Sequence, residues 1–181
     1  MNYTDTDADQ VYLGIGGNVV LAGFASVKDG CLAGLGRLTA HPSIRLVAVS
    51  PWYKTAPVLR EGQAPKQNQT QDWYSNAVVH ISTALTPPEL LAAIHQTEVH
   101  FGRVRKAAEV DAPRGIDIDI IDFAGVVREA DPILPHPRMA ERGFVLAPLA
   151  DLAPDWRHPV TGWGVRELLA EVAPQQKFQQ E

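Results

Sequence analysis

Two aspartates within residues 114–121 have the types and spacing best suited to chemistry in this sequence. Asp117 and Asp119 alternate with isoleucines, so a β-strand through this run would project both carboxylates from one face, one pleat apart. Carboxylates on one face suit Mg²⁺, which keeps positions free for water and for substrate phosphates. The pattern alone equally fits an exposed edge strand whose acids are simply solvated.

Basic side chains flank the acidic run on both sides. Upstream and downstream of it stand Arg103, Arg105, Lys106, His136, Arg138 and Arg142. Guanidinium groups bind phosphate oxygens in a planar, bidentate geometry, so these neighbours favour phosphate chemistry. The formal net charge of the chain is −5, which argues against general nucleic-acid binding and favours one small anionic ligand.

The elements that must position these residues are predicted from hydrophobic periodicity and helix-start signals. Strands are predicted over residues 11–16, 45–53, 73–81 and 116–123, and helices over 25–38, from 86 onwards, 144–152 and 163–172. Residues 86–89 give the clearest signal, because they combine a capping box with proline at the first helical position. The order, βαββαβ with C-terminal helices, predicts an α+β fold: a ferredoxin-like sandwich whose mainly antiparallel sheet is covered by helices on one face.

Length and composition favour a single domain. The 181 residues, 45% of them hydrophobic, are enough for one core. We expect the domain over residues 11–173, between a flexible N-terminal tail (1–10) and a C-terminal tail (174–181), with a polar, glutamine-rich loop over 59–72. The one cysteine cannot form an internal disulfide, and the N-terminus lacks a signal-peptide pattern. A cytoplasmic protein with no membrane span is therefore expected.

Six short motifs follow one another along the chain. They are Gly16-Gly17-Asn18, residues 53–58, residues 74–77, Glu98 with residues 102–106, residues 113–119, and residues 135–146. In their order and approximate spacing, these motifs resemble the 6-hydroxymethyl-7,8-dihydropterin pyrophosphokinase family. The resemblance implies an ATP-dependent enzyme of folate biosynthesis, which transfers diphosphate from ATP to the hydroxymethyl group of the pterin and releases AMP. It also favours the metal site over the solvated strand.

The resemblance implies a nucleotide side of the site with a metal pair. Asp117 and Asp119 would hold two Mg²⁺ that bridge the ATP phosphates, and the catalytic set would be completed by Arg103 and Arg105. The implied ATP contacts come from several segments: Glu98, Arg105, Arg114, Ile120, His136 and Arg142.

The resemblance also implies a slot for the pterin ring. Tyr74 and Phe144 match the family's stacking aromatics. Asn76, two residues after Tyr74 and therefore on the same strand face, would offer a donor and an acceptor to the ring edge. The slot would be lined by Thr55, Ala56, Pro57 and Val58.

Two alternatives remain open from the sequence. The loop between Lys106 and Pro113 lacks the tryptophan usual in the family and contains two acids, which would repel a triphosphate and fit a non-catalytic nucleotide- and pterin-binding paralogue. A metal-dependent nucleotidyltransferase is the other alternative, although its glycine turn usually lies about a dozen residues before the acids. The expected partners are the two small-molecule substrates, with no nucleic acid and no membrane, in a monomer or weak homodimer.

Overall fold

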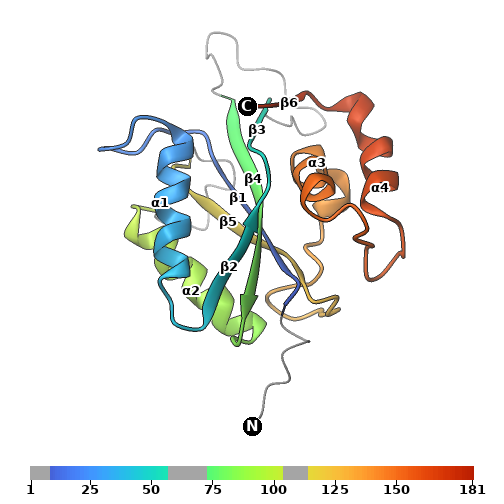
Figure 1. The fold of residues 1–181 in the computed structure, drawn as a ribbon, viewed down its shortest axis with the longest axis horizontal. Coiled ribbons are helices and arrows are strands. Elements are labelled where there is room, and N and C mark those ends of the chain that lie inside the picture. The colour runs from blue at the N-terminus through green and yellow to red at the C-terminus, as the bar shows by residue number, and fades with distance from the viewer. Residues whose placement is uncertain (1–8, 57–72, 104–113) are drawn as a thin grey trace.

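The computed structural model describes residues 9–56, 73–103 and 114–181. In chain order the elements are β1 (Val11–Gly17), α1 (Val27–Thr39), β2 (Ile44–Val49), β3 (Tyr53–Thr55), β4 (Tyr74–Thr83), α2 (Pro87–His100), β5 (Asp117–Phe123), α3 (Gly143–Leu152), α4 (Val165–Val172) and β6 (Phe178–Gln180). Short 3-10 helices cover Met139–Glu141 and Ala173–Gln175. Figure 1 shows the sheet standing between two pairs of helices, α1 with α2 and α3 with α4.

The strands form one antiparallel sheet. Its order is β5-β1-β4-β3-β6, and β2 also pairs with β4. The single strand expected over 45–53 is therefore two, β2 and β3, which pair with different halves of β4. Between them, Ser50 bonds Val78 through its backbone N–H (2.9 Å) and accepts the Val78 N–H at its hydroxyl (3.0 Å). Pro51 follows and has no N–H to continue the ladder.

Two apolar cores lie on opposite faces of the sheet. The core beneath α1 and α2 includes Val11, Leu13, Ile15, Leu35, Val79, Ile94, Ile118 and Ile120. The core beneath α3 and α4 includes Tyr12, Val78, Ile121, Leu146, Leu149, Trp156 and Leu168. The expectation that helices cover one face is therefore wrong, because neighbouring residues of β1 and β4 are apolar on both faces and the C-terminal helices bury the second.

Strand alternation and a β-bulge together determine where the acids of β5 point. Asp117 and Asp119 are half-buried and alternate with buried Ile118 and Ile120, which face α1 and α2. The two acids therefore share the opposite face, as the alternation predicted. The register with β1 shifts where Tyr12 pairs with Asp122, so an extra residue is accommodated and Asp122 also turns towards α3 and α4.

Helix α2 begins as the sequence predicted. The carboxylate of Glu89 accepts the backbone N–H of Thr86 at 2.8 Å and the Thr86 hydroxyl at 2.6 Å, which completes one half of a capping box. Glu98 lies in the last turn of the helix and Arg103 follows the helix, both at the edge of β5. No helix in the described parts of the chain is both long and apolar enough to cross a lipid bilayer.

The C-terminal residues extend the sheet. Strand β6 pairs antiparallel with β3, and the backbone N–H of Glu181 donates to Trp52 O at 2.8 Å. The expectation of a C-terminal tail over 174–181 is therefore corrected, because this segment supplies backbone groups that satisfy the outer edge of β3.

Candidate active site

Two cross-strand rows bring the predicted residues together on the face beneath α3. In one row, Gly16 of β1 lies between Asn76 of β4 and Asp117 of β5, and in the next row Gly14 lies between Val78 and Asp119. Residues directly opposite each other project from the same face of a sheet. Asn76, on the pterin side, thus shares this face with both acids, and the central strand puts no side chain between them.

Glycine is required at the centre of the first row. A Cβ at position 16 would lie 2.1 Å from Asn76 Oδ1 and 3.0 Å from Ser75 O. Gly16 belongs to the Gly16-Gly17-Asn18 motif, whereas Gly14 was not among the predicted site residues. The missed signal was the alternation of Gly14 and Gly16 with buried apolar residues of β1, which leaves one strand face without side chains.

The third residue of that motif joins the first strand to the acidic strand. Asn18 Oδ1 accepts the backbone N–H of Arg114 at 2.8 Å, and the Asn18 N–H donates to Arg114 O at 2.9 Å. This reciprocal pair fixes the chain just before Asp117. The motif therefore fixes the position of the chain where it enters β5.

Each acid faces cationic or basic side chains. Asp117 accepts from Arg103 Nη1 at Oδ1 and from Arg114 Nη1 at Oδ2, both at 2.5 Å. Asp119 Oδ2 lies 3.6 Å from Arg142 Nη1 and 3.8 Å from His136 Nε2. The Asp119 side chain is 42% exposed and that of Asp117 27% exposed, so Asp119 is the more accessible of the two.

Glu98 is fully buried beside this cluster. Its Oε1 accepts the backbone N–H of Ile118 at 2.9 Å and forms an ion pair with Arg103 Nη1. The backbone N–H of Arg103 also donates to Glu98 O at 3.0 Å. Glu98 thus holds Arg103 against the edge of β5, in contact with Asp117.

Burial and neighbouring charges shift the pKa values of the basic groups. Burial lowers the pKa of His136, and Arg142 and Arg138 lower it further while Asp119 opposes them. The neutral imidazole is therefore favoured at neutral pH. Burial also lowers the pKa of Arg142. For Arg114, burial acts in the lowering direction, but the carboxylates of Asp117 and Asp119 outweigh it and the pKa is raised.

Of the predicted pterin residues, Asn76 stands at the other end of the first row, and Thr55 and Tyr74 lie beside it on β3 and β4. Asn76 Nδ2 donates to Thr55 Oγ1 at 2.8 Å, and both side chains are buried. Tyr74 pairs with Thr55 across β3 and β4. Phe144, near the start of α3, has the guanidinium of Arg142 over its ring at 5.4 Å. The predictions for Pro57, Val58 and Arg105 fall outside the described residues.

Ile120 has a different environment from the other predicted nucleotide residues. Its side chain is 5% exposed and belongs to the core beneath α1 and α2. Only its backbone is therefore available to a ligand. Two backbone groups on the outer edge of β5 already form hydrogen bonds. Glu98 accepts from Ile118 N, and His136 N donates to Ile121 O at 2.9 Å.

The acid pair suits Mg²⁺ only if a substrate completes the coordination. Among the described residues, no group of three or more His, Cys, Asp or Glu side chains converges on a metal position. Two carboxylates with an open face fit Mg²⁺ sites in which water and substrate phosphates supply the remaining oxygens. Their chemistry therefore matches the predicted metal role.

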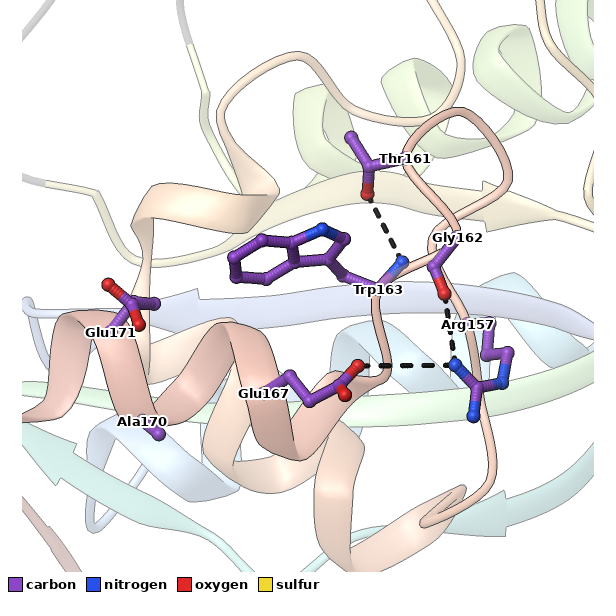
Figure 2. A pocket seen from close by; sticks show the side chains of 7 residues that line it. All are labelled: Arg157, Thr161, Gly162, Trp163, Glu167, Ala170 and Glu171. Carbon is purple, nitrogen blue, oxygen red and sulfur yellow. Dashed lines mark hydrogen bonds and ion pairs between the residues drawn. The ribbon is translucent and has the colours of Figure 1, made fainter.

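A separate surface depression of about 540 Å³ lies at α4, away from these rows. It is lined by Arg157, Thr161, Gly162, Trp163, Glu167, Ala170 and Glu171. Figure 2 shows Arg157 donating to Gly162 O and pairing with Glu167, with the Trp163 ring beside them. None of the predicted site residues takes part in it.

Paired acids among basic side chains are typical of enzymes that transfer phosphate-containing groups with a divalent cation. The sequence model of the 7,8-dihydro-6-hydroxymethylpterin-pyrophosphokinase (HPPK) family matches residues 12–154. The chain is 40% identical over 167 residues to the 2-amino-4-hydroxy-6-hydroxymethyldihydropteridine pyrophosphokinase of Methylorubrum extorquens, covering 91% of this chain and 94% of that protein. For the Pseudomonas aeruginosa pyrophosphokinase the identity is 38% over 162 residues, covering 89% and 90%. The chain belongs to the HPPK family.

Solved structures agree on the fold. Plasmodium falciparum HPPK-DHPS superimposes with a TM-score of 0.63 at 14% identity, covering 89% of this chain and 42% of that one. Family and relatives together make this protein an enzyme, a pyrophosphokinase of folate biosynthesis. Neither the non-catalytic paralogue nor the nucleotidyltransferase is favoured.

Proposed function

We propose that the described face is the site at which diphosphate passes from ATP to the hydroxymethyl group of 6-hydroxymethyl-7,8-dihydropterin. The observation that carries this proposal is the row of Asn76, Gly16 and Asp117. Adjacent strands lie about 4.8 Å apart, so the outer members of the row are roughly 10 Å apart across an open strand. This span suits a bicyclic ring bound at one end and a phosphate chain at the other.

On the nucleotide side, Asp117 and Asp119 would hold two Mg²⁺. The ions would neutralise phosphate charge and orient the reacting groups when bound. Arg103, Arg114 and Arg142 now contact the two acids, and their guanidinium groups would turn to phosphate oxygens when cations take the carboxylates. His136 and Arg105 would add contacts to the phosphates, and the backbone of Ile120 would serve the nucleotide at the edge of β5.

On the pterin side, the hydrogen bond between Asn76 and Thr55 holds the amide in place. Asn76 would present its oxygen and its remaining N–H to the ring edge. Tyr74 and Phe144 would stack on the two ring faces, and residues 55–58 would line the slot. The hydroxymethyl oxygen would then attack the β-phosphorus and release its proton to solvent. The bond between the β-phosphorus and the α–β bridging oxygen would break, and AMP would leave with that oxygen.

Glu98 acts in this proposal through Arg103. Its carboxylate is fully buried and holds both Arg103 and the backbone of β5. The site thus keeps an arginine at the acid pair before the substrate arrives, which lowers the cost of ordering it in the transition state.

We also propose that the fold is of the ferredoxin-like type. Among β1, β2, β4 and β5, the spatial order is β5-β1-β4-β2, with α1 and α2 on one face. This order supports the proposal, with α3 and α4 added on the other face. A cytoplasmic enzyme acting as a monomer or weak homodimer fits the same proposal.

The decisive experiment is incubation of the protein with MgATP and 6-hydroxymethyl-7,8-dihydropterin, followed by separation of the products. We expect AMP and the pterin diphosphate to appear together in equal amounts. Pyrophosphate release would instead support nucleotidyl transfer, and binding of both substrates without turnover would support the non-catalytic paralogue. Either result would overturn the proposal.

A further inference from the structure

The C-terminal segment 176–178 connects two parts of the proposed pterin slot that are far apart in sequence. One part is the end of β3 with Thr55 and Ala56, and the other is the start of α3 with Phe144. The segment lies beyond residues 12–154, which match the family. A role for this segment in the slot rests on the proposed function, although Gln176 and Phe178 themselves lie outside the family match.

On the β3 side, the connection is through the backbone. Strand β6 continues the sheet so that Phe178 pairs with Thr55. The next step of the ladder is the hydrogen bond from Ala56 N to Lys177 O at 3.1 Å. The backbone at Thr55 and Ala56 is thereby fixed from its outer edge.

On the α3 side, the connection is through the side chain of Gln176. Its Oε1 accepts the backbone N–H of Gly143 at 2.8 Å, and its Nε2 donates to the backbone oxygen of Glu141 at 2.7 Å. One amide group thus uses its acceptor and a donor on the two residues flanking Arg142. This bidentate contact fixes the chain one residue before Phe144.

Phe178 fills the space between the two sides. Its ring meets the Tyr53 ring edge-on, with centroids 6.3 Å apart. A Cβ at position 143 would lie 2.8 Å from Phe178 Cε1, so glycine at 143 allows the helix to approach this ring closely. Tyr53 also donates to Asp151 Oδ2 of α3 at 2.5 Å. β3 and α3 are therefore held at a set separation.

We infer that the C-terminal segment sets the width of the pterin slot, and that Gln176 is a positioning residue for pterin binding. The amide of Gln176 holds the start of α3 against β6, and β6 holds the backbone that lines the opposite side. Loss of the amide would let Phe144 move relative to Thr55 and Ala56. Most of the nucleotide side lies on β5 and α2, and no hydrogen bond in the described residues joins Gln176 to those elements. Arg142 is the exception, because it stands between the two residues that Gln176 holds. Loss of the amide should therefore affect pterin binding more than ATP binding.

The test compares Gln176→Ala and Gln176→Met with Gln179→Ala. Methionine keeps the length of the side chain without its hydrogen bonds, and Gln179 is an exposed glutamine in the same segment. Steady-state kinetics with each substrate varied in turn would give both KM values. We expect both Gln176 variants to raise the KM for the pterin about tenfold, because two hydrogen bonds are lost. The KM for ATP should rise by a smaller factor, through Arg142, and Gln179→Ala should behave like wild type.

A purely structural role would give a different pattern. An unchanged pterin KM with a lowered melting temperature, an equal rise in both KM values, or a wild-type pterin KM in Gln176→Met would each overturn the inference. The proposed function is tested separately by the wild-type enzyme. If wild type forms no AMP with the pterin, the proposed function fails, whereas an active wild type with normal Gln176 variants rejects the positioning role alone.

Discussion

The sheet face beneath α3 has two ends that use similar residues in different ways. At one end Gly14 and Gly16 occupy the central strand, and the flanking acids are half-buried beside cations. At the other end the central residue is Tyr12, whose neighbours across the strands are His80 and Asp122. We call the end at Gly14 and Gly16 the open end and the end at Tyr12 the closed end. The two are only a few residues apart on the same strands.

The central residue of each row explains the contrast. Tyr12 fills its row and packs with α3, and its ring centroid lies 5.1 Å from that of His80. Asp122 is consequently 3% exposed and accepts from Trp156 Nε1 at 3.0 Å and from Gly125 N at 3.2 Å. Glycine leaves its rows unfilled, so a ligand can occupy the space that a protein side chain fills elsewhere. An aspartate is thus a structural group at one end and a proposed cation ligand at the other.

Removal of the aspartate charge, tested once at each end, gives the largest expected effect. Asp117→Asn keeps the shape of the side chain but removes the charge that the Mg²⁺ requires, so the rate of AMP formation should fall about 10³-fold. Asp122→Ala at the closed end should instead reduce the free energy of unfolding by about 1–3 kcal/mol, with activity per folded molecule retained. Product analysis and denaturant unfolding of both variants test this. Activity within tenfold of wild type in Asp117→Asn would remove Asp117 from the metal role.

Filling the open end is expected to have the next largest effect. Gly16→Ala places a methyl group 2.1 Å from Asn76 Oδ1, which forces Asn76 away from Thr55. Displacement of a binding group by about 1 Å can cost roughly 10²-fold in rate, and the pterin KM should rise as well.

Gly14→Ala is the matched control for this row. Its Cβ would meet only the end of the Ile121 side chain, at 3.2 Å, which can adjust. We expect a rate within about tenfold of wild type. If both alanine variants lost activity equally, the clash with Asn76 would not be the cause.

Removal of the buried charge behind the open end should have a smaller effect. Glu98→Gln keeps an acceptor for the backbone N–H of Ile118 but loses the ion pair with Arg103. Arg103 retains Asp117 and is 19% exposed, so the loss should be about 1–3 kcal/mol of unfolding free energy. We also expect a raised KM for ATP with little change for the pterin. An unchanged KM for ATP would show that Glu98 does not act through the nucleotide side.

Local sequence patterns predicted the parts of this site that depend on local geometry. The shared face of Asp117 and Asp119 follows from strand alternation, and the start of α2 follows from the capping residues at 86–89. The resemblance indicated which residues to combine, and the structure brings Asn76 and both acids onto one face.

The rest depends on contacts between distant segments, which no local pattern contains. Burial of Glu98 requires α2 to dock at the edge of β5, and the break at Ser50 requires Val78 of another strand. The pairing of β6 with β3 joins residues more than a hundred positions apart. The role of Gly14 becomes visible only when the acids and Asn76 are placed on either side of β1.

The smallest expected effect is a pH dependence confined to the closed end. Burial raises the pKa of Asp122 above its ordinary value of 3.8, although hydrogen bonds from Trp156, Gly125 and Phe123 oppose the shift. As pH rises through this range, the unfolded chain loses the proton before the folded chain does. The unfolded state then binds fewer protons, so the contribution of Asp122 to stability is complete below 3.8 and is lost as pH rises through the folded pKa.

Asp122→Asn should expose this dependence. Asparagine stays neutral at every pH and keeps one acceptor, so its cost in hydrogen bonding does not vary with pH. The unfolding free energy of the variant minus that of wild type should therefore become more positive as pH rises from about 4, and should level off above the folded pKa. Denaturant unfolding across this range gives the difference directly. A flat or falling difference would show that burial does not raise the pKa of Asp122, and the two ends would then differ in their partners but not in the effect of burial on charge.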